Sequence, residues 1–229
     1  MPSRPDAAKR KDAPARADGR RRVGRPSIHA PDVERSIVME AAYQALAENL
    51  EGKTSVSAIC ARAGLSTTSF YRHFKSKDDL FLAMFEAEAE KVAHELDEKI
   101  DLAEDAHQAV REWIRSYLML SFEPRRRQRT LAMLSPEVSR MPGYASSVAK
   151  VQERHRQPLI RALRAGAKDG SFTCARPEND AVLIQDILGS VLVRRRDGVE
   201  KRDSGTILLD IIDFLHRAIG LRLNGHADG

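Results

Sequence analysis

The chain has 229 residues, of which 42% are hydrophobic and only 5% aromatic, and its formal net charge at pH 7 is +5. This length can bury a sizeable core in one large or two small domains. No run approaches the roughly 18 consecutive apolar residues of a membrane span, and the charged N-terminus lacks the apolar segment of a secretory signal. The two cysteines, Cys60 and Cys174, are far apart and lack metal-type spacing. We therefore expect a cytoplasmic protein with no membrane segment and no metal site.

The excess positive charge is confined to the start of the chain. Residues 1–27 carry a net charge of +6, whereas the remaining residues carry −1. The Pro, Ala and Gly content of this segment predicts a disordered basic arm. Its Gly-Arg-Pro core is typical of short arms that lie in narrow A·T-rich minor grooves, so we expect Arg22 and Arg25 to contact DNA. The alternative is a tail that only improves solubility.

The next segment predicts a helix with one apolar face. Pro31 suits the first turn, and the segment from Asn49 to Gly52 ends the pattern. The inward positions are spaced at helical intervals and are Val33, Ile37, Val38, Ala41, Ala45 and Leu46.

Residues 54–77 predict two short helices joined by a tight turn, which is a helix-turn-helix. Gly64 suits the left-handed backbone that follows a helix, and Ser66 can cap the second helix. Phe70 and Phe74 share the inner face of that helix. The side chains left on its outer face form a small polar and aromatic set that suits base edges and phosphates in a DNA major groove, namely Thr67, Thr68, Ser69, Tyr71 and Arg72.

The run from Ala63 to Leu80, Ala-Gly-Leu-Ser-Thr-Thr-Ser-Phe-Tyr-Arg-His-Phe-Lys-Ser-Lys-Asp-Asp-Leu, resembles the end of the DNA-binding domain of the TetR (tetracycline-repressor-like) family of transcriptional regulators. The resemblance extends back to about Val33. It implies an all-α fold with an N-terminal three-helix DNA-binding domain and a C-terminal helical domain that binds an effector and dimerises. We place the basic arm at 1–27, the DNA-binding domain at 28–76 and the larger domain at 77–229.

The resemblance also implies roles for individual residues. Ser55 and Ser69 would contact phosphates, while His73 and Lys77 would anchor the DNA backbone. Thr67, Thr68 and Tyr71 would lie nearest the bases. Ser57 and Arg72 complete the predicted DNA-binding set, although Ser57 stands where many members have a charged or larger polar residue.

The rest of the sequence keeps a helical pattern. Ser76 to Asp79 has the form of a capping box and starts a helix that continues to about Glu98. Pro136 and Pro142 bracket an expected loop, and Pro158 is expected to kink a long helix unless its missing amide is tolerated there. The predicted helices after residue 103 span about 106–122, 126–134, 144–168, 177–195 and 204–223.

The last two predicted helices carry more apolar residues than one face of each can bury in a monomer. We interpret residues 177–223 as a two-fold, four-helix homodimer interface, which suits a palindromic operator in double-stranded DNA. The alternative is a helical hairpin that is entirely internal.

Trp113 and Tyr117 lie one helical turn apart in a chain that is poor in aromatic residues. Because ligands of the family lie in the larger domain, we expect a small, largely hydrophobic effector of unknown identity in a cavity ringed by Trp113, Tyr117, Met133, Met141 and Tyr144. The alternative is that these side chains only fill the core.

The sequence contains no Gly-rich phosphate loop, no His-Glu-x-x-His and no Gly-x-Ser-x-Gly. We therefore expect no catalytic residue and no cofactor, and the remaining possibility of an enzyme with a recruited DNA-binding domain lacks a catalytic constellation. The favoured hypothesis is a homodimeric, effector-controlled repressor. The alternative is an architectural DNA-binding protein whose C-terminal domain only dimerises.

Overall fold

A computed structural model of the chain describes residues 30–49 and 52–220. These residues form helices and no strand, which confirms the all-α prediction. Arg22, Arg25 and the rest of the predicted basic arm lie outside the described residues. The helices are α1 (Pro31–Glu48), α2 (Val56–Ala63), α3 (Thr67–His73), α4 (Lys77–Asp101), α5 (Ala106–Phe122), α6 (Pro124–Met133), α7 (Pro136–Ser139), α8 (Tyr144–Asp169), α9 (Pro177–Arg196) and α10 (Ser204–Ile219).

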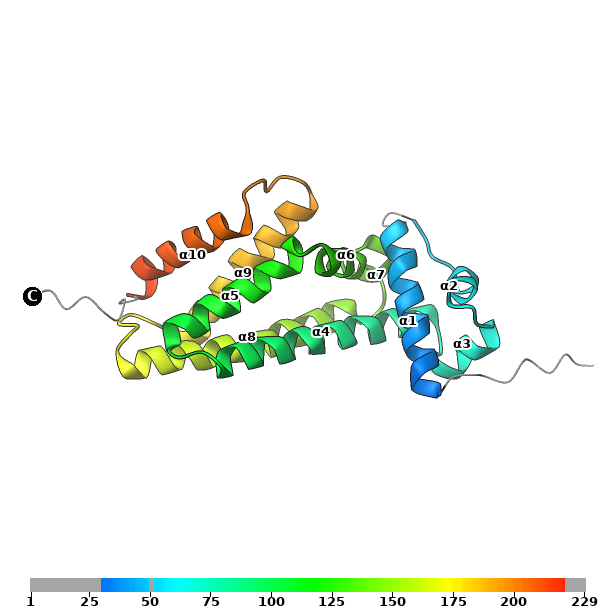
Figure 1. Cartoon of the computed structure of the whole chain (residues 1–229), viewed down its shortest axis with the longest axis horizontal. Helices are drawn as coiled ribbons and strands as arrows, with labels where there is room; N and C mark the ends of the chain where they lie inside the picture. The colour runs from blue at the N-terminus through cyan, green and yellow to red at the C-terminus, as the bar shows by residue number, and fades with distance from the viewer. Residues whose placement is uncertain (1–29, 50–51, 221–229) are drawn as a thin grey trace, which may run out of the picture.

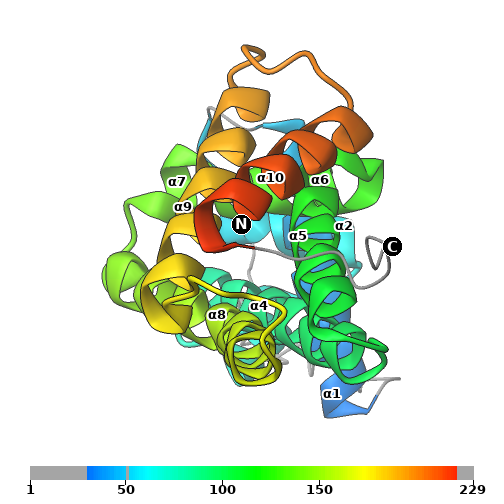
Figure 2. The same cartoon turned by 90° about the vertical axis from the view of Figure 1, so that its left-hand side faces the viewer.

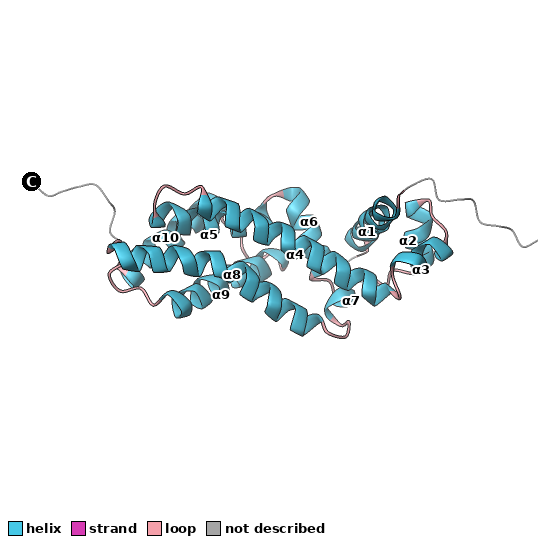
Figure 3. Cartoon of the chain, turned by 90° about the horizontal axis from the view of Figure 1, so that it is seen from below, coloured by secondary structure: helices cyan, strands magenta, loops and turns pink. Residues whose placement is uncertain are grey.

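The helices form a small head at one end of an elongated molecule and a larger body behind it (Figure 1). The head contains α1, α2 and α3, and α4 leads from it along α8 in the body. Figure 3 shows the same division from below. In Figure 2, α9 and α10 lie on the opposite side of the body from α4.

Capping groups set the helix boundaries in the head and at its junction with α4. The Ser76 hydroxyl accepts a hydrogen bond from the Asp79 amide at 3.0 Å, and the Asp79 carboxylate accepts one from the Lys75 amide at 2.8 Å. This arrangement confirms the predicted start of α4, because each bond satisfies a backbone donor that has no partner within the helix.

Two local features differ from the sequence predictions, and at a third position, Pro158, the helix continues despite the missing amide, an outcome that the sequence left open. Residues expected to form a loop after Pro136 contain the short helix α7, whose first turn is capped by Ser135. Helix α8 runs through Pro158, which is buried within it. Helix α10 ends at Ile219 and not at 223, because Gly220 takes the left-handed conformation with φ 63°.

The first turn of α1 is also rotated relative to the predicted inward stripe. Val33 is 46% exposed, whereas Glu34 is only 2% exposed. The polar partners of Glu34 on α3 explain this choice and are described below.

Two apolar clusters stabilise the molecule. The body core joins α4, α5, α8, α9 and α10 and includes Trp113, Leu159 and Ile184. The head core joins α1, α2 and α3 to the start of α4, and it also receives Met133, Val138 and Met141 from the segment of α6 and α7. Apolar residues from both sides of residue 76 therefore share one buried cluster.

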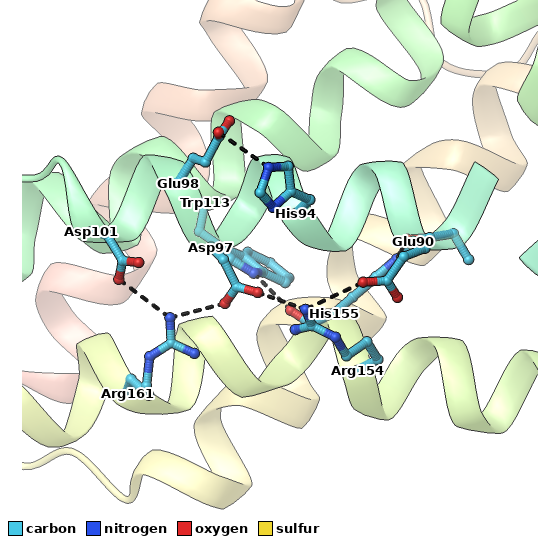
Figure 4. Close-up of polar contacts among 10 residues, drawn as sticks. Glu90, His94, Asp97, Glu98, Asp101, Trp113, Arg154, His155 and Arg161 are labelled. Carbon is cyan, nitrogen blue, oxygen red and sulfur yellow. Dashed lines mark hydrogen bonds and ion pairs between the residues drawn. The ribbon is translucent and has the colours of Figure 1, made fainter. Parts of the chain in front are cut away.

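An ionic seam joins α4 to α8 along the body (Figure 4). Asp97 on α4 accepts hydrogen bonds from Arg154 at 2.7 Å and from Arg161 at 2.9 Å. Burial alone would raise the pKa of Asp97, but the hydrogen bonds from the two arginines lower it below its usual value. The seam keeps α4, the helix that reaches the head, aligned with α8.

Candidate nucleic-acid interface and effector region

The helix-turn-helix is present in the head, and its geometry follows from its caps. The Ser55 hydroxyl accepts from the Ala58 amide at 3.1 Å, and the Ser66 hydroxyl accepts from the Ser69 amide at 3.0 Å. Gly64, with φ 66°, supplies the left-handed residue of the turn. Ile59 and Phe70 are both fully buried, so α2 and α3 pack against the head core. Their outer faces remain available to a partner.

Six predicted DNA-contacting residues lie exposed on these outer faces, and we call them the reader surface. They are Ser55, Ser57, Thr67, Thr68, Tyr71 and Arg72. Tyr71 is 58% exposed, and its ring meets Phe70 edge to face with ring centroids 5.2 Å apart. This contact packs the Tyr71 ring against Phe70 while more than half of Tyr71 remains exposed.

Ser69 and His73, two other predicted contacts, face the protein interior. Both bond to Glu34, with His73 Nε2 2.9 Å and Ser69 Oγ 3.5 Å from Glu34 Oε2. Arg35 also reaches α3 from α1, because its guanidinium donates to the His73 carbonyl at 3.3 Å. The side chains of Ser69 and His73 are thus engaged within the head and are not presented to a DNA backbone.

Lys77 is engaged between head and body. Its ammonium donates to the Thr54 carbonyl at 2.9 Å and pairs with the Glu137 carboxylate of α7. The same carboxylate accepts from the Thr54 amide at 2.9 Å and 3.1 Å. We call Thr54, Lys77 and Glu137 the Glu137 clamp. It ties Thr54, which precedes the Ser55 cap of α2, to both α4 and α7, and the sequence pattern did not indicate this role.

The predicted effector residues fall into two groups. Trp113 is fully buried in the body core, stacks on Tyr117 with centroids 5.0 Å apart, and donates its indole N–H to the His155 carbonyl at 3.0 Å. Figure 4 marks this bond between the Trp113 indole and the backbone of His155. Met133, Met141 and Tyr144 instead pack in or against the head core. The structure therefore does not bring all five around one cavity, because α6 and the start of α8 lie at the head end.

Polar side chains surround the aromatic stack in the body core. Burial raises the pKa of Tyr117, while a hydrogen bond with Gln185 opposes that rise. Gln185 is itself 4% exposed and donates to the Gln152 carbonyl at 3.1 Å. His155 is also buried, with Nε2 2.8 Å from the Ala89 carbonyl. The stack is therefore an apolar region with a few fixed polar groups, which is the composition of many ligand sites.

Apolar side chains are exposed along α9 and α10. Leu183 is 56%, Leu209 59% and Phe214 47% exposed. A groove of about 510 Å³ runs between the two helices, with Ile187 and Ile211 in its wall and Asp186, Arg194, Arg202 and Asp210 among its polar residues. The two helices are therefore not entirely internal in a single chain.

Within residues 30–49 and 52–220, no group of His, Cys, Asp or Glu side chains is arranged to hold a metal ion. None of the helices in these ranges is long and apolar enough to cross a membrane.

Known protein families and solved structures resemble this chain in the sequence of its head and in its overall fold. The family profile of bacterial regulatory proteins of the tetR family matches residues 38–84. No curated protein matched the chain.

Solved structures match over most of the chain. The transcriptional regulator FadR from Bacillus subtilis, solved in complex with stearoyl-CoA, is 18% identical with a TM-score of 0.66, and the match covers 79% of this chain and 96% of that chain. The fatty acid degradation regulator FadR from Bacillus halodurans is 17% identical with a TM-score of 0.69, covering 88% and 100%. A protein from Saccharomonospora viridis described as a transcriptional regulator, solved with choline, is 17% identical with a TM-score of 0.69, covering 82% and 98%. Residues 38–84 thus resemble the tetR family of bacterial regulatory proteins, and the chain has the fold of TetR-family transcriptional regulators.

Proposed function

We propose that this regulator is a homodimeric repressor that binds a palindromic operator and leaves it when a small, largely hydrophobic effector binds the body. The observation that carries the proposal is the reader surface, where polar and aromatic side chains stand exposed on a short helix whose inner face is fixed by packing. Such a helix fits the DNA major groove, and its outer side chains can contact base edges.

The proposed homodimer uses α9 and α10 of both copies. Leu183, Leu209 and Phe214 are exposed in one chain, and a second copy would remove this apolar surface from water. A two-fold axis through these helices would present two heads to two half-sites of an operator. The interface is expected to continue into residues 221–223, which lie outside the described residues.

DNA selected from a random pool by the full-length protein tests the operator. We expect an enriched sequence with two-fold symmetry and half-sites separated by about one helical turn. The competing proposal, an architectural protein whose body only dimerises, predicts bound DNA with no enriched sequence. Recovery of an unenriched pool would therefore reject the repressor.

We place the proposed effector site at the Trp113 and Tyr117 stack in the body core. Gln185 and His155 supply fixed polar groups beside it. Met133, Met141 and Tyr144 belong to the head core and would respond to the effector through α6 and α8. The dimer would have one conformation whose heads fit the operator and another whose heads are wrongly spaced for it. The effector must bind the second conformation more tightly, because equal affinity for both would leave their populations unchanged.

Stearoyl-CoA and choline are two useful first probes because similar structures were solved with them, and their chemistry differs greatly. We expect a compound that releases the selected DNA to change the fluorescence of Trp113, which is the only tryptophan in the sequence. Trp113→Phe should alter the affinity of the same compound. A compound that releases DNA from the Phe variant with unchanged affinity would place the effector site elsewhere.

A further inference from the structure

The carboxylate of Glu34 begins a hydrogen-bonded chain that reaches the reader surface. Glu34 lies in the first turn of α1 and is 2% exposed. Ser69 Oγ lies 3.5 Å from Glu34 Oε2, and Arg72 Nη2 lies 2.5 Å from Ser69 Oγ. A hydroxyl has one donor and two lone pairs, so Ser69 can donate to Glu34 while it accepts from Arg72.

This chain links a buried group to an exposed one. Ser69 is 4% exposed, whereas Arg72, three residues later on α3, is exposed beside Tyr71. Glu34 is held in addition by His73, whose Nε2 lies 2.9 Å from the same carboxylate oxygen. The acceptor to which Ser69 points is thus fixed by a second contact from the C-terminal turn of α3.

A tether of this kind matters because a free arginine side chain samples many rotamers and loses that freedom on binding. Holding one guanidinium nitrogen in advance reduces this loss and leaves the other N–H groups to donate. A phosphate offers several oxygens on different sides, so the orientation of the guanidinium is less critical there. Orientation has greater value for a guanine edge, where two donors must meet O6 and N7 together.

We propose that Arg72 is a specificity-determining residue that reads a guanine in each half-site, and that Glu34 and Ser69 are positioning residues that orient it. This inference rests on the proposed operator binding. It assigns Ser69 a role inside the protein in place of a phosphate contact.

A double-mutant cycle with Ser69→Ala and Arg72→Ala tests the proposal. The DNA is the duplex selected by the full-length wild-type protein, with a random-sequence duplex as the nonspecific reference. Each single variant should lower affinity for the selected duplex about 10-fold, which corresponds to the lower part of the range for one bidentate base contact. The double variant should lose no more than about 10-fold, because both changes remove the same interaction.

DNA selections repeated with each variant measure its sequence preference, which would not change if Ser69 and Arg72 had only a structural role. Preference for one guanine per half-site should be lost with Arg72→Ala and with Ser69→Ala. It should be kept with Ser36→Ala, a matched control in which an exposed serine of α1, outside the reader surface, is changed instead. Affinity for the random-sequence duplex should stay unchanged in all of them.

If Ser69→Ala fails to fold, as judged by its thermal unfolding, Glu34→Gln takes its place in the same cycle. The glutamine keeps the size of the side chain but removes the charge that orients the Ser69 hydroxyl. A loss of affinity of about 100-fold in the double variant would overturn the proposal. An equal loss of affinity for selected and random-sequence DNA would also overturn it, because it would indicate a phosphate contact. If the wild-type protein itself selects no sequence, the proposed function fails first, and the two failures remain distinguishable.

Discussion

Tyr71 is the largest exposed side chain of the reader surface, and its ring rests on Phe70. Because Tyr71 is exposed and the inner face of α3 is packed, we expect Tyr71→Ala to weaken binding to the selected DNA by about 1–3 kcal/mol. The free energy of unfolding should change little. Affinity measured by fluorescence anisotropy, together with a thermal melt, checks both expectations. Full affinity in a folded variant would remove Tyr71 from the set of base contacts.

His155 gives the body core a pH dependence whose sign follows from its surroundings. Burial lowers the pKa of His155, and the hydrogen bond to the Ala89 carbonyl only partly offsets this effect. The native state therefore takes up a proton less readily than the unfolded chain, in which histidine titrates near about pH 6.5. The stability that His155 contributes is present above that pH and is lost as the pH falls below it.

We therefore expect the melting temperature of the wild-type protein to fall more steeply between about pH 7.5 and pH 5.5 than that of His155→Gln. The control is His94→Gln, because the His94 side chain is 75% exposed and should leave the slope unchanged. Carboxylates such as Asp97, whose pKa is lowered, destabilise all three proteins alike on acidification. Parallel curves for wild type and His155→Gln would contradict this assignment.

At the scale of elements, the Glu137 clamp is the point at which α4 and α7 hold the start of α2. In Lys77→Met the apolar stem remains, but the Glu137 carboxylate, 9% exposed, loses its cation. We expect the free energy of unfolding to fall by about 1–3 kcal/mol in urea melts, as for a buried group deprived of its partner.

DNA binding by Lys77→Met separates this role from the phosphate contact that the sequence implied. Removal of a phosphate-binding cation would reduce the slope of log K against log salt by about 1, whereas removal of the clamp leaves that slope unchanged. Lys75→Met, which changes an exposed neighbour, is the matched control. If Lys77→Met left the free energy of unfolding unchanged but reduced the slope of log K against log salt, Lys77 would be a DNA-binding residue, as the sequence implied.

The proposed dimer depends on the outer faces of α9 and α10. Leu209→Glu places a charge at a position that is 59% exposed in one chain, so the fold should tolerate it while the interface should not. Sedimentation velocity at micromolar concentration should show a monomer with normal helical content. Leu102→Glu, at a position 80% exposed beyond the end of α4, should remain dimeric. A dimeric Leu209→Glu protein would argue against this interface.

Local sequence patterns predicted the helices and their caps. They did not predict polar contacts between residues that are far apart in the sequence. The caps at Ser66 and Ser76 and the inward face of Phe70 and Phe74 depend on residues within one or two turns, so spacing alone identified them. Glu34 lies 39 residues from its partner His73, and Glu137 lies 60 residues from Lys77. No periodicity connects such positions. For the same reason the sequence grouped Trp113 with Met133, although the fold assigns them to different cores.

For the whole molecule, the distribution of charge predicts how DNA binding responds to salt. Residues 1–27 hold a net charge of +6 and lie outside the described residues. Deleting them should reduce affinity and flatten the dependence of log K on log salt by about 0.9 for each phosphate that the segment neutralises. The dimer should be unaffected. The control for charge is a variant in which the arginines and lysines of this segment are replaced by glutamine, so that its length is kept. An unchanged salt slope in the deletion variant and in the glutamine variant would leave the segment only a role in solubility.

The shared head core has a practical consequence for protein engineering. Met133, Val138 and Met141 complete a cluster whose other members come from α1 to α4, and Glu137 caps the same junction with its carboxylate. A fragment cut after α4 would leave the apolar surfaces of Phe81 and Met84 without these neighbours. A chimera that carries this head on a foreign sensor must therefore bring α6 and α7 with it, or a sensor whose own helices replace them. The unit that can be transplanted is discontinuous in sequence, although the DNA-reading segment itself is continuous.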